Sequence, residues 1–254
     1  MLSNNQEKQL KQLSTKKGRQ AQQKFLVEGK KIILDLLSRK FPFELICTTQ
    51  NYFEEIKNEV RKTNTPVEII TEKQLYNISS LQHPQPVFAV AKIYEHKLIS
   101  DSLKESVSLI LDDISDPGNL GTVIRLADWF GIKNIICSKS TVELFNPKVI
   151  QASMGSFSNV NVVYVESLEL FFKSPEIKTL NIPIIGTTLD GVSYKTIEPQ
   201  PCFLVLGSEA NGISENLLSL LTHKVVIVGS SSKFAESLNV SVAATLVTSY
   251  FCNR

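Results

Sequence analysis

The second half of the chain contains six short, almost uninterrupted apolar runs, and segments with helical spacing separate them. Runs of this kind are typical of strands in a parallel sheet that is covered by helices on both faces. The runs are VSLILDD, NIICS, VNVVYVE, IPIIGTTL, CFLVLG and KVVIVG, and the intervening helical segments are TVIRLADWF, PKVIQASMG, SLELFFKS, SENLLSLL and, last, NVSVAATLVTSYF. The sequence therefore predicts an α/β fold with a parallel sheet in this half.

The first half also alternates strands with helices and predicts a second, smaller α/β unit that ends near residue 95. A length of 254 residues accommodates two such domains. The polar stretch EHKLISDSLKES is the expected connection between them. We therefore expect an N-terminal domain over residues 1–95, a linker over 96–106 and a second domain over 107–254.

The charge of the chain is unevenly distributed. Residues 1–40 contain ten Lys or Arg and three acidic residues, so the remainder carries −5 although the whole chain is only +2. A basic segment on a mildly acidic body suggests attraction to a polyanion, with nucleic acid as the first candidate. The segment KKGRQAQQK has no aromatic residue for base stacking, so Lys16, Lys17 and Arg19 would contact phosphates. A solvated basic helix without a partner explains the charge equally well.

Several classes of protein are disfavoured by composition. We expect no secretory signal, because no apolar stretch follows the basic N-terminal residues. We expect no membrane span, because the longest apolar-leaning run, 238–251, is interrupted by polar residues. Four dispersed cysteines and three scattered histidines indicate reduced thiols in a cytoplasmic protein without a metal site. The glycine-rich motifs of dinucleotide-binding and P-loop proteins, and the G-x-S-x-G motif of serine hydrolases, are absent from the sequence.

Ligands of open parallel sheets bind at the carboxyl ends of the strands, which directs attention to three loops. The first is DDISDPGNLGTVIRLADWFGI, in which we expect a tight turn and then a helix that starts near Thr122. Arg125 would then be an exposed cation in the first turn, where the helix dipole disfavours it. A phosphate-binding role for Arg125 is the favoured interpretation.

The other two loops also place polar side chains after buried strands. In LVLGSEANGIS, Gly207 lets a ligand approach the backbone and Glu209 offers a carboxylate, although an acid in a first helical turn explains Glu209 equally well. In ESLNVSVAATLV, Ser237 and Asn239 precede an apolar helix. One of these residues would suffice as a helix cap, so the surplus suggests that the turn binds something.

The three loops, in this order, resemble the sequence motifs of the SpoU (TrmH-type) RNA 2′-O-ribose methyltransferases of the SPOUT superfamily. The first half, in FLVEGKKIILDLL and HPQPVFAVA, is similar to that family's auxiliary substrate-binding domain, so the resemblance covers nearly the whole chain. The resemblance implies a catalytic domain with a deep trefoil knot, S-adenosylmethionine as the cofactor, and a homodimer. It also implies a cofactor site made by Thr187, Gly207, Ile227 and Leu238, and an active site made by Asn119, Arg125, Glu209, Ser237 and Asn239.

Two departures from the family pattern stand out: Val228 occupies a position where proline is usual, and HPQPVFAV lacks a common glycine. Family proposals assign proton removal to Arg125, but a guanidinium stays protonated at neutral pH. We therefore expect Arg125 to stabilise the developing alkoxide and the adjacent phosphate. The auxiliary domain favours ribosomal RNA over tRNA as the substrate by analogy. A non-catalytic RNA-binding protein on the same fold is the alternative from another class.

Overall fold

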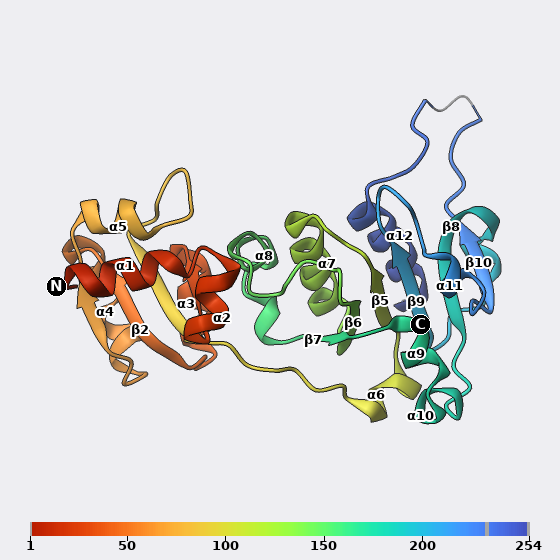
Figure 1. Ribbon diagram of the computed structural model, residues 1–254, viewed down its shortest axis with the longest axis horizontal. Helices are drawn as coiled ribbons and strands as arrows, with labels where there is room; N and C mark the ends of the chain where they lie inside the picture. The colour runs from red at the N-terminus through yellow and green to blue at the C-terminus, as the bar shows by residue number, and fades with distance from the viewer. Residues whose placement is uncertain (1, 232–233, 253–254) are drawn as a thin grey trace. The chain divides into compact units, whose positions relative to one another are not determined.

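The computed structural model of the protein describes residues 2–231 and 234–252, and it divides into two compact units (Figure 1). The first unit comprises Met1–Glu95 and Leu144–Ser158, and the second comprises His96–Glu143 and Asn159–Arg254. A short segment from the second half of the sequence therefore packs with the first half. The domain division expected from the sequence did not include this exchange.

The first unit is built on a four-stranded mixed sheet. Its order is β1 (Lys24–Glu28), β4 (Val87–Lys92), β2 (Phe43–Thr48) and β3 (Val67–Ile69). β4 runs antiparallel to both of its neighbours, and β2 and β3 are parallel. Because side chains alternate along a strand, both faces of this sheet carry apolar residues that must be covered.

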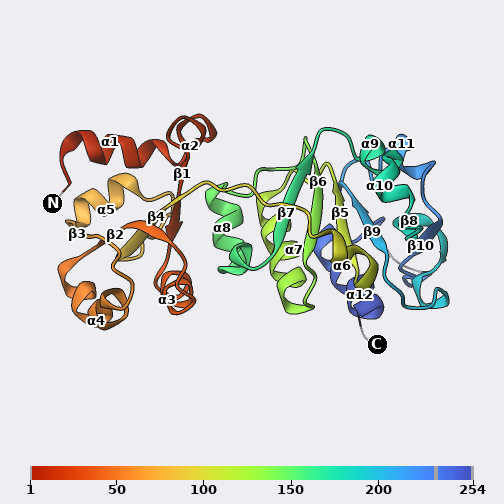
Figure 2. The same cartoon turned by 90° about the horizontal axis from the view of Figure 1, so that it is seen from below.

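Helices cover the two faces of the first sheet separately (Figure 2). On one face, α1 (Asn4–Gln12) and α5 (Glu72–Ile78) bury Leu26 and Phe88, and α2 (Lys16–Gln22) connects α1 to the sheet. On the other face lie α3 (Lys30–Ser38) and α4 (Gln50–Arg61). The basic N-terminal segment thus forms two helices, α1 and α2, that pack against each other. Leu13 is fully buried in the core beneath them.

The segment 144–158 completes the first unit. It contains α8 (Pro147–Ser153), which contacts β1, and a 3₁₀ turn, η1 (Ser156–Ser158). Phe145 and Phe157 pack against Phe25, with ring centroids 4.5 Å and 5.8 Å apart. Left-handed Met154 and Gly155 end α8, and a side chain at Gly155 would lie 3.8 Å from Leu36 of α3. Buried aromatic surface thus fixes this segment on the first unit.

The second unit contains the predicted parallel sheet. Its six strands are all parallel, in the order β10 (His223–Val226), β8 (Ile184–Ser193), β9 (Phe203–Gly207), β5 (Ser108–Asp112), β6 (Asn134–Ser138) and β7 (Asn161–Val165). Leu109, Ile110 and Leu111 are fully buried, which confirms that β5 is covered on both faces. The prediction of an α/β fold with a parallel sheet is confirmed.

The helices of the second unit lie on opposite sides of this sheet (Figure 2). α7 (Pro117–Trp129) and α12 (Val240–Cys252) contact each other on one side. The other side carries α9 (Leu168–Lys173), α10 (Pro175–Lys178) and α11 (Glu215–Leu218), and a 3₁₀ turn, η2 (Tyr194–Thr196), follows β8. The expected linker includes a sixth helix, α6 (Ser100–Glu105), whose Leu103 is buried in the core. Leu103 therefore fixes the linker to the core of the second unit, although the polar composition of this stretch indicated an unpacked connection.

Candidate functional site

The loop after β5 leads directly into α7. Asp116 caps this helix, because its side-chain oxygen accepts a hydrogen bond from the Asn119 amide at 2.8 Å, and Pro117 occupies the first helical position. The prediction that the helix starts near Thr122 is therefore wrong. Proline is favoured at the first helical position, so Asp116 and Pro117 begin α7 in the place where a tight turn was expected.

This earlier start moves Arg125 to the third turn of α7, so the argument from an unfavourable helix dipole does not apply to it. Its side chain is exposed, as the apolar spacing of the helix predicted. Within residues 2–231 and 234–252, the Arg125 side chain makes no hydrogen bond or ion pair. An exposed guanidinium with five donors and no partner in the protein can bind a phosphate or another anion.

The loop after β9 is a tight hairpin that only glycine permits. Ser208 and Gly212 exchange two backbone hydrogen bonds of 3.0 Å and 2.9 Å. A Cβ on Gly207 would lie 2.1 Å from the carbonyl carbon of Gly212, and Gly212 itself has a φ of 67°. The hairpin presents Glu209 at its exposed tip.

Three side chains, one from each predicted loop, form a continuous hydrogen-bonded chain. The Asn119 amide donates to Glu209, and the Asn239 amide donates to the Asn119 side-chain oxygen at 3.0 Å. The partners are separated by 90 and 120 residues in the sequence. The structure thus brings together Asn119, Glu209 and Asn239, which the sequence placed at the carboxyl ends of β5 and β9 and before α12.

Asn239 has two functions in this arrangement. Its side-chain oxygen accepts from the Ser241 amide at 2.9 Å and from the Ser241 hydroxyl at 2.6 Å, so it caps α12. Its amide nitrogen meanwhile holds Asn119. Helix capping and site assembly are therefore not alternatives at this residue. Ser237 is exposed beside it and has no hydrogen bond among the described residues.

Asp112 is a further residue of this edge that the sequence analysis did not single out. It ends β5 opposite Gly207 of β9, and its carboxylate accepts from the Ser214 amide at 2.8 Å. The side chain is 8% exposed. It fixes the end of the hairpin that carries Glu209. An acidic residue at the last position of a buried strand was the signal that could have identified it.

The four expected cofactor residues lie on three segments of the second unit. Thr187 of β8 donates its hydroxyl to the Val205 carbonyl at 3.2 Å, and Gly207 ends β9. Ile227 and Leu238 lie in the segment between β10 and α12. No hydrogen bond among the described residues joins the four.

The chemistry of these four positions suits a nucleoside. Leu238 is an apolar side chain that is 47% exposed. Its backbone groups have no partner in the parts of the chain that the structure describes. An exposed apolar surface beside free backbone donors and acceptors can hold an adenine ring and pair with its edge. The residues therefore fit an adenosine-containing cofactor in kind.

The three basic residues expected to bind phosphate differ in exposure. Lys16 and Lys17 are exposed on α2. Arg19 is only 2% exposed, and its guanidinium donates to the Leu13 carbonyl at 2.8 Å. The structure therefore does not support a phosphate contact by Arg19. Its side chain holds the turn between α1 and α2, an arrangement that charge alone could not reveal.

The described residues also bear on metal binding and on insertion into a membrane. No group of three or more His, Cys, Asp or Glu among them could hold a metal ion. None of the helices in residues 2–231 and 234–252 has the length and apolar character to cross a membrane.

The fold and the site together define a class: a two-unit α/β protein whose larger unit joins three polar loops at the carboxyl edge of a parallel sheet. Comparison with known families identifies it further. Residues 106–249 match the model of the SpoU rRNA Methylase family, and residues 4–89 match that of the MRM3-like substrate binding domain. The chain belongs to the SpoU rRNA methylase family and is an RNA methyltransferase by that membership.

Individual relatives agree with this assignment. The chain is 30% identical over 253 residues to the Bacillus subtilis 23S rRNA (guanosine(2553)-2′-O)-methyltransferase RlmP, covering 96% of this chain and 94% of that protein. It is 35% identical over 146 residues to the mitochondrial rRNA methyltransferase 1 of Schizosaccharomyces pombe, covering 54% and 48%. An AdoMet-bound rRNA methyltransferase from Sinorhizobium meliloti superposes with a TM-score of 0.83 at 26% identity, covering 98% of this chain and 94% of that one.

Proposed function

We propose that the protein transfers a methyl group from S-adenosylmethionine to a ribose 2′-hydroxyl of RNA, with ribosomal RNA favoured over tRNA. The observation that carries this proposal is the hydrogen-bonded chain Glu209–Asn119–Asn239, which joins the three loops beside the sheet. The names of the relatives support it: one is called a 2′-O-methyltransferase of 23S rRNA, and one solved neighbour is described as AdoMet-bound.

The cofactor supplies a methyl group that is already activated by its sulfonium, so the protein contributes position and charge rather than covalent chemistry. Thr187, Gly207, Ile227 and Leu238 would hold it. The exposed side chain and free backbone of Leu238 suit the adenine. The close backbone packing at Gly207 keeps the hairpin tip, with Glu209, at the end of β9.

The reacting hydroxyl must be oriented and its developing negative charge stabilised. The bound cofactor would supply the methyl group to the 2′-oxygen, and the hydroxyl proton would have to leave as that bond forms. Arg125, exposed and without a partner in the described structure, would stabilise the alkoxide and the neighbouring phosphate. Asn119, Glu209 and Asn239 would fix the loops around the reacting atoms, and Ser237 would contact the substrate phosphate.

The proposal includes the topology and assembly that family resemblance implies. The C-terminal segment would form the trefoil knot, and α12 would pack against a second subunit. Val242 and Leu246 support the second point, because these apolar residues of α12 are 47% and 40% exposed in the single chain. A dimer through the catalytic domain would cover them.

The RNA would also contact the first unit. Lys16 and Lys17 are retained as phosphate contacts because both are exposed on α2, and Arg19 is left out because it is buried. Replacing both lysines with glutamine should weaken RNA binding and reduce its dependence on salt concentration, because each phosphate contact releases counterions. An unchanged salt dependence would remove α2 from the RNA-binding surface.

The test of the activity is methyl transfer from labelled S-adenosylmethionine to total unmodified cellular RNA. The wild type, Arg125→Ala and the surface control Arg61→Ala should be compared, with a thermal shift by S-adenosylhomocysteine measured for each. We expect label in RNA with the wild type and Arg61→Ala, almost none with Arg125→Ala, and an equal thermal shift for all three. The modified bond should resist alkali.

Other outcomes distinguish the alternatives. Wild-type protein that binds RNA but gives no thermal shift with S-adenosylhomocysteine would support a non-catalytic RNA-binding protein instead. Full activity of Arg125→Ala would exclude the role given to Arg125. Label recovered in tRNA but not in ribosomal RNA would reverse the favoured substrate.

A further inference from the structure

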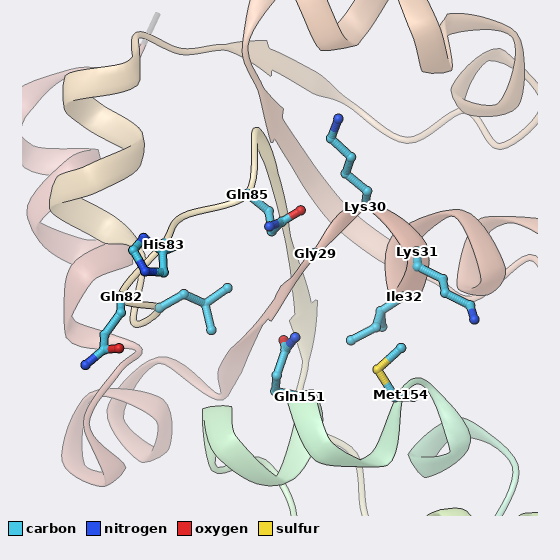
Figure 3. A pocket seen from close by; sticks show the side chains of 10 residues that line it. Gly29, Lys30, Lys31, Ile32, Gln82, His83, Gln85, Gln151 and Met154 are labelled. Atoms are coloured by element: carbon cyan, nitrogen blue, oxygen red, sulfur yellow. The ribbon is translucent and has the colours of Figure 1, made fainter.

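The first unit contains a cavity of about 390 Å³ beside the start of α3 (Figure 3). This volume lies within the range of about 300–1,000 Å³ that is usual for small-ligand sites. Three segments line it: the start of α3, the loop that leads into β4, and α8. The lining residues are Gly29, Lys30, Lys31, Ile32, Leu81, Gln82, His83, Gln85, Gln151 and Met154. None of these ten is acidic.

Two amide side chains face each other in this cavity. Figure 3 shows Gln85, from the loop before β4, and Gln151, from α8, pointing toward one another across the space beside Gly29. A Cβ on Gly29 would lie 3.9 Å from the Gln151 amide nitrogen, so the missing side chain leaves room at this point. Each amide side chain carries an NH2 group that donates and a carbonyl oxygen that accepts. This is the pattern needed to bind the edge of a nucleobase.

The rest of the lining divides into an apolar wall and a cationic mouth. Met154 lies on one side and His83 on the other, and both can contact the faces of a base (Figure 3). Ile32 lies beside Met154 but is only 2% exposed. The Lys30 ammonium lies over the Tyr52 ring, 4.5 Å from its centre, and so points away from the cavity (Figure 3). Lys31 is exposed, and its side chain leaves the start of α3 on the side away from the two amides (Figure 3). It is therefore the cation of the lining that can reach a phosphate outside the cavity.

The loop that forms one wall is fixed in place. Glu28, the last residue of β1 and 5% exposed, accepts from the Ser80 amide at 3.0 Å and from the hydroxyls of Ser79 and Ser80. A buried carboxylate with three donors holds the segment that leads to Gln85. The cavity wall is thereby preorganised, which reduces the entropy cost of binding.

From these features we infer that the cavity binds an unpaired nucleotide of the substrate RNA, with Gln85 and Gln151 on the base edge and Lys31 on its phosphate. The inference rests on the proposed function and adds a second RNA subsite to it. Gln151 and Met154 fall within the stretch that matches the methylase family, yet they belong to the first unit. The subsite is thus completed by a part of the chain outside the substrate-binding match at residues 4–89.

The test measures equilibrium binding of short fluorescent single-stranded RNA homopolymers and of a blunt RNA duplex, without cofactor. Lys31→Gln and Gln151→Ala are compared with the exposed controls Lys62→Gln and Gln50→Ala. We expect each cavity variant to weaken single-strand binding about tenfold, Gln151→Ala because it removes an amide–base pair and Lys31→Gln because it removes a phosphate contact. The controls and duplex binding should be unchanged, and Gln151→Ala should reduce the preference among the four homopolymers.

Several results would overturn the inference. One is that the cavity variants bind single-stranded RNA as tightly as the wild type does. Another is that a variant loses affinity equally for single-stranded RNA and for the duplex. Binding that depends on Lys31 alone and is displaced by millimolar phosphate would identify a simple anion site instead. A thermal shift with S-adenosylhomocysteine, measured on the same variants, separates this outcome from failure of the proposed activity. The absence of a thermal shift with S-adenosylhomocysteine in the wild type would contradict the proposed activity. A normal shift in Gln151→Ala shows that this variant is folded.

Discussion

Asn239 allows a quantitative test of the site, because its two hydrogen-bonding functions can be separated by substitution. Asn239→Ala removes both the cap of α12 and the bond to Asn119. Asn239→Ser keeps a capping side chain, because serine and asparagine are comparable caps. The serine side chain, however, is too short to replace the 3.0 Å contact with Asn119. The difference between the two variants therefore isolates the cap.

The expected magnitudes follow from these contacts. Loss of the cap costs about 1 kcal/mol, and loss of the bond to Asn119 costs about another 1 kcal/mol. Local opening of α12 should then become about 30-fold more frequent in Asn239→Ala and about fivefold more frequent in Asn239→Ser, since about 1.4 kcal/mol is a factor of ten. Hydrogen exchange of peptides that cover α12 measures this opening directly.

Two further variants serve as controls. Asn216→Ala changes an exposed asparagine in α11 and should leave the exchange of α12 unchanged. Asn119→Ala should reproduce the effect of Asn239→Ser, and combining them should add nothing, because both remove the same bond. Equal exchange in Asn239→Ser and Asn239→Ala would refute the capping argument. Wild-type exchange in both would show that Asn239 does not join the loops.

Three other predictions concern separate parts of the fold. Gly207→Ala should reduce S-adenosylhomocysteine affinity at least tenfold in calorimetry, because its Cβ would lie 2.1 Å from a Gly212 backbone atom and displace the hairpin; unchanged affinity would contradict this. The hydrogen bond from Lys24 lowers the pKa of Glu44 from its ordinary 4.5, so the ionised carboxylate stabilises the fold at neutral pH and loses this effect as pH falls through the lowered pKa. Glu44→Gln should therefore cost less than about 1 kcal/mol of unfolding free energy at pH 7 in denaturant titrations, and equal stability of the two proteins at pH 7 would exclude this contribution. Burial raises the pKa of Cys47 to about 12, so this thiol should resist iodoacetamide at pH 8 until the protein unfolds, and rapid native alkylation would show that it is accessible.

Local sequence patterns predicted most of the strands and the α/β class of the fold. The apolar runs predicted the strands of the parallel sheet because burial on both faces leaves little room for polar residues. The order of those strands was not predicted, since it depends on which buried surfaces meet and not on any single run. The meeting of Asn119 and Glu209 was foreseeable from a general rule, because β5 and β9 end at the same edge of one sheet.

The errors have identifiable physical causes. The start of α7 was placed too late because Gly118 suggested a turn, whereas the Asp-Pro pair before it is a strong helix-start signal. Arg19 was expected to contact phosphate because it belongs to a basic segment and arginine is usually exposed, but it is 2% exposed and donates to the Leu13 carbonyl, a contact between α1 and α2 that charge does not indicate. The role proposed for Gln151 had no local signal in the sequence, since it depends on the position of α8 against β1, a strand more than 100 residues earlier.

The packing of residues 144–158 on the first unit has a consequence for biosynthesis. A nascent chain that has reached residue 95 still lacks Phe145 and Phe157, the aromatic partners of Phe25. Adding residues 96–158 takes about 3–13 s at about 5–20 residues per second. During this interval the aromatic surface of β1 stays open to water or to a chaperone. The N-terminal domain therefore cannot finish folding first, although it is made first, and it must wait for a part of its successor to emerge.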